Sequence, residues 1–224
     1  MTRHIHEISY GLLDHLAEEF YMKMPGNTSE GMNLAKQYCK GMSIRYSTIF
    51  LTDDDVKQKQ CYLREDSLYT YSYNFSCIGF KQIVESSMIG AGFYLMVSDE
   101  CEPTGQLLDD YYNHMWQTAY MDAARAYIKS SLESFWIEQS NEVRPIKITN
   151  SYGPGFYGMG TGEIQKFYTF LGGSDIGVSI NGHMLNPAKS CTGVFLVIEA
   201  GMYQHALPCE TCAMDGQCEL CSAR

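Results

Sequence analysis

The first forty residues contain two stretches in which apolar side chains recur at helical spacing. The first stretch ends before Pro25-Gly26 and predicts a helix over residues 5–20. Its apolar stripe consists of Ile5, Ile8, Leu12, Leu16 and Phe20. The second stretch predicts a helix that begins at Asn27, which would form a capping box with Glu30, and runs to about Gly41.

Two later segments have the character of strands. Residues 43–51 are rich in β-forming side chains, and the acidic run at residues 53–55 ends this segment. Between residues 69 and 77, aromatic and polar side chains alternate in strict period two, which predicts a half-buried strand with an aromatic face. Such a face could stack on a flat cofactor, but we expect it to pack in the core of a sheet.

The middle of the chain predicts a short helix near residues 81–87, a strand through residues 92–98 and a long helix over residues 106–139. Alanines at helical spacing would let the long helix approach a sheet closely. Pro145 begins the next strand. This order of elements predicts an α+β fold with a mainly antiparallel sheet covered by helices.

A glycine-rich segment, residues 151–162, reads Ser-Tyr-Gly-Pro-Gly-Phe-Tyr-Gly-Met-Gly-Thr-Gly. After it we expect a short amphipathic helix over residues 163–171 and two strands, residues 176–180 and 193–198. A Leu-Asn-Pro-Ala-Lys-Ser turn, residues 185–190, separates the two strands. Glycines at this density indicate backbone that takes positive φ or approaches a ligand closely.

The same glycines allow a reading as a nucleotide site. Gly153, Gly155 and Gly158 satisfy Gly-x-Gly-x-x-Gly, and Asp175 follows after about 20 residues. This pattern would suggest a nucleotide-dependent oxidoreductase. Pro154 inside the turn, the short helix and the position of Asp175 before the next strand all speak against it. A plain glycine-rich surface turn is the other alternative.

The order of these motifs resembles the C-terminal activation domain of cobalamin-dependent methionine synthase. The resemblance covers residues 85–205, and the strand at residues 92–98 with the helix that follows it belongs to it. Its motifs are Pro154-Gly155-Phe156, the next helix, residues 176–181, residues 184–190 and Thr192-Gly193. We therefore expect an activation-domain-like unit at residues 1–205 and a separate tail at residues 206–224.

The resemblance implies a protein that serves a corrinoid-dependent methyltransferase. The activation domain binds S-adenosylmethionine beside the cobalamin of a neighbouring domain, so that the reduced cobalamin is remethylated. The cofactor-binding residues that the resemblance implies are Gly153, Pro154, Gly155, Phe156, Tyr157, Pro187, Ala188 and Tyr203. Residues 153–162 and 186–188 would form a concave surface for a corrinoid-binding protein, with Phe156 and Tyr157 facing the macrocycle.

One residue departs from the family pattern where it bears on ligand binding. The family's Arg-x-x-Pro-Gly-Tyr turn has its arginine four residues before the glycine, and Ser151 occupies this position here. Because a hydroxyl cannot replace a bidentate guanidinium–carboxylate contact, we expect S-adenosylmethionine to bind weakly or not at all. Arg144 and Lys147 are cations that could substitute, and Lys189 is expected to cap backbone carbonyls or remain solvated.

Composition limits the classes of partner. The chain of 224 residues is 45% hydrophobic, which permits a sizeable core. Its net charge of -10 and pI near 5.0 argue against a nucleic-acid or anionic-membrane surface, since either needs a basic face. Residues 1–7 carry no apolar signal region and no apolar run is long enough to span a bilayer, so we expect a cytoplasmic protein.

Nine cysteines are present, and four of them form a Cys-x2-Cys-x5-Cys-x2-Cys pattern near the end of the chain. These four are Cys209, Cys212, Cys218 and Cys221. Paired cysteines at this spacing predict one metal centre, either Zn²⁺ or an iron–sulfur cluster. The short loop between the pairs favours the cluster, while a redox-active or unstructured tail is the alternative. We expect the other five cysteines to be reduced and partly buried.

Three functional hypotheses follow. The first is a reactivation or accessory protein of a corrinoid (vitamin B12) methyltransferase system that supplies electrons, S-adenosylmethionine or both. The second is a docking module without catalytic activity that binds the corrinoid protein and carries a structural zinc tail. The third is the nucleotide-dependent oxidoreductase, which accounts for the fewest residues.

Overall fold

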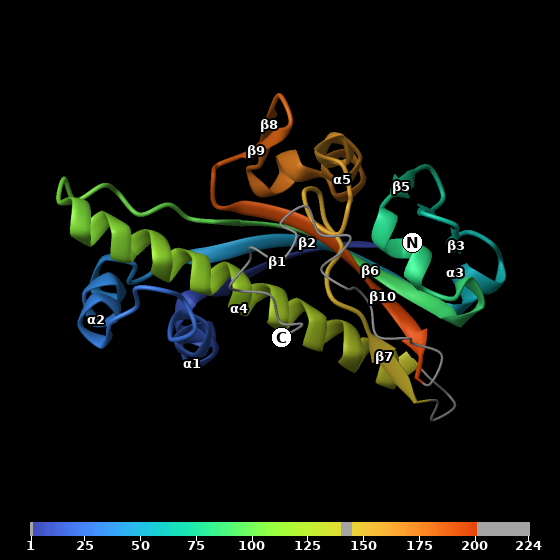
Figure 1. Cartoon of the computed structure of the whole chain (residues 1–224), viewed down its shortest axis with the longest axis horizontal. Helices are drawn as coiled ribbons and strands as arrows, with labels where there is room; N and C mark the ends of the chain where they lie inside the picture. The colour runs from blue at the N-terminus through green and yellow to red at the C-terminus, as the bar shows by residue number, and fades with distance from the viewer. Residues whose placement is uncertain (1, 140–144, 201–224) are drawn as a thin grey trace.

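The computed structural model describes residues 2–139 and 145–200, which fold around a five-stranded sheet (Figure 1). The strand order is β1-β2-β6-β10-β7, and every neighbouring pair is antiparallel. The strands are β1 (Arg3–Ser9), β2 (Ser43–Leu51), β6 (Met88–Ser98), β10 (Ser190–Glu199) and β7 (Ile146–Ile148). The predicted α+β fold with a mainly antiparallel sheet covered by helices is confirmed.

Helices cover one face of the large sheet, and smaller elements cover the other (Figure 1). The first face carries α1 (Tyr10–Tyr21), α2 (Ser29–Tyr38) and α4 (Leu107–Gln139). The opposite face carries α3 (Asp53–Lys57), α5 (Ile164–Leu171), a hairpin and a small three-stranded sheet. The small sheet consists of β3 (Tyr62–Arg64), β4 (Ser67–Tyr69) and β5 (Asn74–Ser76), and the hairpin of β8 (Ser179–Asn181) and β9 (Met184–Asn186). Within the described residues, short 3-10 helices connect these elements: η1 (Ile78–Gln82), η2 (Glu85–Ser87), η3 (Thr161–Glu163) and η4 (Gly173–Ile176).

The large sheet separates two hydrophobic cores. Every residue of β6 is buried, because this central strand is covered on both faces. Its side chains alternate between the cores: Tyr94 and Met96 belong to the core under α1, α2 and α4, whereas Phe93 and Leu95 belong to the core under α5. The strand therefore brings polar Tyr94 against the long helix.

Helix α4 lies close to β6 because small residues occur on both surfaces. Ala119 and Ala123 of the helix are fully buried. On the strand, a Cβ added at Gly90 would lie 2.1 Å from the Trp136 ring, and one at Gly92 would lie 2.6 Å from Leu132. The alanines of α4 permit the close approach to the sheet that the sequence predicted, and Gly90 and Gly92 leave room for it on the strand.

The predicted helix over residues 5–20 is wrong in its first part. Residues Arg3–Ser9 form the edge strand β1, paired with β2, and the helix begins at Tyr10. Only Ile8 of this strand is buried, so the spacing of its apolar residues carries no information about a helix. The second helix is capped by Thr28, which accepts a hydrogen bond from Gly31 N at 2.9 Å. Asn27 instead donates to carbonyls at the end of α1.

The single strand predicted over residues 69–77 is also wrong. Strand β4 ends at Tyr69 and β5 begins at Asn74, and the two residues face each other across a hairpin. Thr70 N donates to Tyr73 O at 2.8 Å and closes the turn. Period-two alternation does not distinguish one strand from two strands joined by a tight turn. The aromatic core role is confirmed for Phe75, whose ring packs against those of Phe93, Phe167 and Phe170.

Two further local predictions need correction. The short helix expected at residues 81–87 is replaced by η1 and η2, and the strand expected at residues 176–180 begins only at Ser179, after η4. Gly177 has a φ of 82°, which interrupts the extended backbone there. No helix in the described ranges has the length and apolarity needed to cross a bilayer.

The topology speaks against the dinucleotide alternative. The glycine-rich segment lies between β7 and η3, and β7, β10 and β6 are antiparallel neighbours. A dinucleotide-binding glycine motif joins a strand to the helix of a parallel βαβ unit, whose helix N-terminus receives the pyrophosphate. That context is missing here, so the oxidoreductase hypothesis loses its structural basis.

Candidate functional site

A polar cluster lies where the glycine-rich segment crosses the large sheet. Ser151, at the start of this segment, shares a hydrogen bond of 2.8 Å with the hydroxyl of Tyr94 on β6. Arg125 of α4 donates from Nε to the same hydroxyl at 3.1 Å. The guanidinium of Arg125 is therefore linked through the Tyr94 hydroxyl to Ser151, the position at which the family pattern has an arginine.

Asp122 and Cys191 complete the surroundings of Arg125. Nη1 donates to Asp122 Oδ1 at 2.7 Å, one helical turn away on α4, and Nη2 lies 3.7 Å from Cys191 Sγ on β10. The side chains of Arg125 and Asp122 are 34% and 30% exposed, so this cluster reaches solvent at one side. We call Tyr94, Asp122, Arg125, Ser151 and Cys191 the arginine cluster.

The protonation states in the arginine cluster follow from burial and charge. Burial would lower the pKa of Arg125, but Cys191, Tyr94 and Asp122 raise it above its usual value, so the guanidinium stays charged. Burial raises the pKa of Tyr94 and of the Cys191 thiol, and Arg125 opposes both shifts. Tyrosine and cysteine are therefore neutral near pH 7, and Tyr94 can donate its proton toward Ser151.

Two glycines allow the segment to pass over β10. A Cβ at Gly193 would lie 2.4 Å from Ser151 Oγ and 2.8 Å from Tyr152 O. A Cβ at Gly153 would lie 2.6 Å from Thr192 O. Tyr152 forms two backbone hydrogen bonds with Val194, of 2.9 and 2.8 Å, which fix the crossing. Both glycines are needed for close approach rather than for an unusual φ.

Beyond the crossing, the segment folds into a compact turn against η1. Phe156 N donates to Gly153 O and Met159 N donates to Phe156 O, both at 2.9 Å. Tyr157 O accepts hydrogen bonds from Gly79 N at 2.9 Å and from the Cys77 thiol at 3.2 Å. These bonds hold the backbone so that it presents its side chains in one geometry.

The cofactor-binding residues expected on this turn differ in their exposure. The Phe156 side chain is 64% exposed, and nothing lies within 4 Å of a Cβ built at Gly155. Tyr157 is half-buried, with its ring 5.2 Å from that of Tyr152, and Pro154 is half-buried as well. Ile78 of η1 is 49% exposed and lies near Gly158 of the turn, because a Cβ built at Gly158 would lie 2.8 Å from it.

The second expected turn, at Pro187 and Ala188, lies at the beginning of β10. Pro187 is half-buried and Ala188 is exposed. The points where the two turns reach β10, Val194 and Ser190, are four residues apart, which is about 13 Å of strand. The contacts of the glycine-rich turn lead to η1, so a concave surface shared by both turns stays a prediction.

Lys189 and Lys147 have separate positions. Lys189 Nζ donates to His114 O at 3.0 Å and to Thr118 Oγ1 at 2.6 Å, which confirms its expected role on backbone carbonyls. Burial lowers its pKa to about 8. Lys147 is exposed on edge strand β7, where it faces Ile198 of β10 rather than Ser151.

Several expected site residues lie outside the described residues. They are Arg144, Tyr203 and the metal-binding cysteines Cys209, Cys212, Cys218 and Cys221. In residues 2–139 and 145–200, no group of three or more histidine, cysteine or acidic side chains is arranged to hold a metal ion. The five cysteines of these ranges carry free thiols. The metal centre of the tail therefore stays a prediction.

The sequence pattern did not point to Tyr94, Asp122, Arg125 or Cys191 as site residues. The strand that carries Tyr94 and the helix that carries Asp122 and Arg125 were predicted, but not the contact between the two. One local signal was available: an acidic and a basic residue three positions apart on a largely apolar helix, at Asp122 and Arg125. A charged pair on a helical face that otherwise packs against a sheet is a reason to look for a polar partner.

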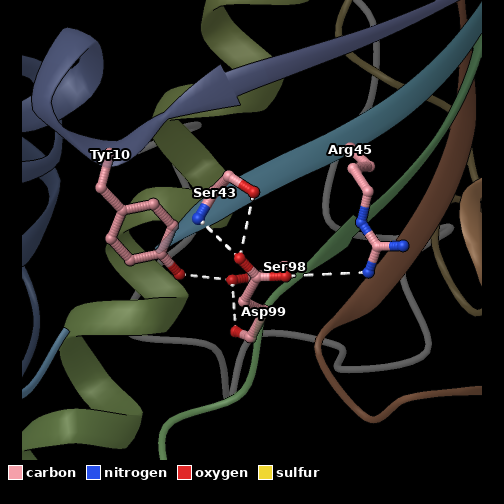
Figure 2. Close-up of polar contacts among 5 residues, drawn as sticks. All are labelled: Tyr10, Ser43, Arg45, Ser98 and Asp99. Carbon is pink, nitrogen blue, oxygen red and sulfur yellow. Dashed lines mark hydrogen bonds and ion pairs between the residues drawn. The ribbon is translucent and has the colours of Figure 1, made fainter. Parts of the chain in front are cut away.

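A second polar cluster lies at the C-terminal end of β6 (Figure 2). Asp99 accepts hydrogen bonds from the backbone and the hydroxyl of Ser43, at 2.9 and 3.0 Å, and forms an ion pair with Arg45. Ser98 contacts the hydroxyl of Tyr10 and donates to Asp99 O at 2.8 Å. These contacts join α1 to the ends of β2 and β6.

Comparison with known proteins agrees with the observed architecture. No family model matches the sequence, and no match was found among curated proteins. Among solved structures, the chain is similar to the MetH reactivation domain, whose crystal structure was determined with AdoHcy bound. The two share this fold. The match has a TM-score of 0.60 and 11% identity, and it covers 92% of this chain and 81% of the MetH domain.

Proposed function

We propose that this chain is an accessory protein of a corrinoid-dependent methyltransferase system and that it contacts a corrinoid-binding partner. The observation that carries this proposal is the fold similarity to the MetH reactivation domain over 92% of the chain. The sequence resemblance to the activation domain of cobalamin-dependent methionine synthase points in the same direction. The net charge of -10 favours a partner surface that is basic, or one that is neutral and bound by shape.

Phe156 is the contact residue in this proposal. Its ring is 64% exposed on a turn whose backbone is held by hydrogen bonds at Phe156 N and Phe156 O. An aromatic ring on a rigid turn loses little conformational entropy when it is buried by a partner. Ile78, which lies near Gly158 of the same turn, is 49% exposed and adds apolar area. Together they suit the apolar upper side of a corrin ring, which needs contact area more than hydrogen bonds.

The arginine cluster bears on S-adenosylmethionine. A carboxylate is held best by two parallel N–H donors of one guanidinium. In this chain, the donors of Arg125 are directed at Tyr94, Asp122 and Cys191. A ligand carboxylate would compete with Asp122 for Nη1. We therefore propose weak binding of S-adenosylmethionine, in agreement with the serine at position 151.

The docking test compares two exposed apolar residues. The probe is a corrinoid-binding protein from the same methyltransferase system, loaded with hydroxocobalamin and titrated with the full chain by calorimetry and visible absorption. Phe156→Ala should raise the dissociation constant at least about tenfold, because a central aromatic contact is lost. Ile137→Ala is the matched control, since Ile137 is 65% exposed but lies on α4, which covers the opposite face of the sheet. It should leave the affinity unchanged.

Two results would contradict the proposal. One is a wild-type chain that neither binds the loaded partner nor changes the corrinoid spectrum. The other is equal affinity for wild type and Phe156→Ala, which would remove the glycine-rich turn from the interface. Gly155 is a poorer probe than Phe156, because its φ of 86° would strain any larger residue and mix folding with binding.

The second candidate is a docking module without catalytic activity. The internal pairing of Arg125 favours it, since a chain that binds no methyl donor would need no free cation at this position. Calorimetry with S-adenosylmethionine and metal analysis of the intact chain separate the two candidates. A dissociation constant in the low micromolar range, or an iron–sulfur absorption spectrum, would favour the accessory protein. A colourless zinc protein without affinity for S-adenosylmethionine would favour the docking module.

A further inference from the structure

Two thiols from distant parts of the sequence meet beyond the ends of β2 and β6. Cys39 Sγ lies 3.0 Å from Cys101 Sγ, although the two residues are 62 positions apart. Cys39 caps the C-terminus of α2, with its N–H donating to Ala35 O at 2.9 Å. Cys101 lies in the connection from β6 to α4. The pair therefore bridges two connections that flank the sheet.

The backbone on either side of the pair is held firmly. Asp99, two residues before Cys101, binds Ser43, four residues after Cys39, through backbone and side chain (Figure 2). Met42 Sδ lies 3.5 Å from Cys101 Sγ and fills the adjacent space. A separation of about 3 to 3.5 Å between reacting atoms is that of a near-attack arrangement. The two sulfurs thus lie about 1 Å beyond the length of a disulfide bond.

The two thiols differ in accessibility. Cys39 is 2% exposed, whereas Cys101 is half-buried. Burial raises the pKa of Cys39, and its neighbour Cys101 raises it further, while the charge of Lys189 favours the thiolate. An incoming disulfide would therefore reach Cys101 first, and Cys39 would be the internal thiol that resolves the adduct.

We infer that Cys39 and Cys101 form a redox-responsive pair that closes to a disulfide by exchange with a small-molecule disulfide such as oxidised glutathione. The Cys101 thiolate attacks one sulfur of oxidised glutathione, a mixed disulfide forms, and one glutathione leaves and takes up a proton. The Cys39 thiolate then attacks the Cys101 sulfur and releases the second glutathione. Two protein thiols are oxidised, and one glutathione disulfide is reduced to two thiols.

Closure would tie the C-terminus of α2 to the segment that leads into α4. A cross-link between residues 62 positions apart removes many conformations from the unfolded chain, so it should stabilise the fold. The midpoint of thermal unfolding should rise by about 5 to 15 °C in the oxidised protein. Dithiothreitol should reverse the shift.

The experiment treats the full chain with oxidised glutathione, blocks free thiols and maps tryptic peptides by mass spectrometry. Cleavage after lysine and arginine places Cys39 alone in peptide 37–40 and Cys101 alone in peptide 82–125. We expect a cross-linked pair of these peptides in wild type, together with the rise in thermal midpoint. In Cys39→Ser, a stable glutathione adduct should remain on Cys101, and the midpoint should not rise.

Two further variants serve as controls. Cys61→Ser removes a fully buried thiol elsewhere and should still give the cross-link. Cys101→Ser, at the more exposed member, provides a second variant if Cys39→Ser folds poorly, and it should abolish both the cross-link and the shift. A persistent Cys101 adduct in wild type would overturn the inference, as would pairing of Cys39 with another cysteine. The two sulfurs would then be packed thiols only.

Discussion

The crossing of the glycine-rich segment over β10 should depend on Gly193 having no side chain. In Gly193→Ala, the new Cβ would lie 2.4 Å from Ser151 Oγ and 2.8 Å from Tyr152 O. Ser151 can rotate away, but only by breaking its 2.8 Å hydrogen bond with Tyr94. Tyr152 O cannot move freely, because it accepts a hydrogen bond of 2.8 Å from Val194 N. The variant therefore strains the backbone as well as the cluster.

The expected loss in the free energy of unfolding has two parts. A lost hydrogen bond between largely buried hydroxyls costs about 1 kcal/mol. Overpacking against backbone that cannot relax costs about 1 to 3 kcal/mol. We expect Gly193→Ala to lower the free energy of unfolding by about 2 to 4 kcal/mol. Urea denaturation followed by circular dichroism measures this directly.

Two comparisons isolate the cause. Gly160→Ala alters the same segment where nothing lies within 4 Å of the new Cβ, so it should change stability by less than about 0.5 kcal/mol. Adding Ser151→Ala to Gly193→Ala removes the closer contact and should recover part of the loss. If Gly193→Ala is as stable as Gly160→Ala, the crossing is not as close as described and the reasoning fails.

Three other predictions concern ligand, metal and pH. Asp122→Ala should remove the acceptor of Arg125 Nη1 and tighten S-adenosylmethionine binding about tenfold by calorimetry; an unchanged affinity would mean that Arg125 does not face the ligand. Cys212→Ser/Cys218→Ser should lose the predicted metal on elemental analysis, and retention of metal would contradict a four-thiolate site. Lys189 has its pKa lowered from 10.5 to about 8, so the folded state binds fewer protons than the unfolded state between these values. Its contribution to stability should therefore rise with pH in that window, and the stability difference between wild type and Lys189→Met should show this rise; a pH-independent difference would refute it.

The predictable parts of this protein are those with strong local signals. The long helix, the buried strand β6 and the final strand β10 follow from periodicity and from runs of apolar residues. The turn in the glycine-rich segment is predictable because glycine adopts positive φ without steric cost, as Gly155 and Gly158 do here. The α+β class follows from the order of these elements.

Edge strand β1 and the β4–β5 hairpin could not be predicted from the sequence, each for its own physical reason. The side chains of β1 are mostly exposed, and its stability comes from backbone hydrogen bonds to β2, about forty residues later in the chain. Backbone pairing of this kind has no side-chain signature. In the hairpin, the alternation continues through the turn and conceals it.

The sequence alone determined the fold class, the turn at residues 151–162 and the absence of an arginine at position 151. Only the tertiary structure decided that Arg125 and Ser151 bind the same Tyr94 hydroxyl and that the thiol of Cys39 contacts that of Cys101. The first arrangement depends on how closely α4 packs on the sheet, which Gly90, Gly92 and the alanines of α4 set together, and the second on the contacts that join Asp99 to Ser43. Packing distances of this kind arise from many side chains acting at once, whereas a helix or a turn is encoded by a few neighbouring residues.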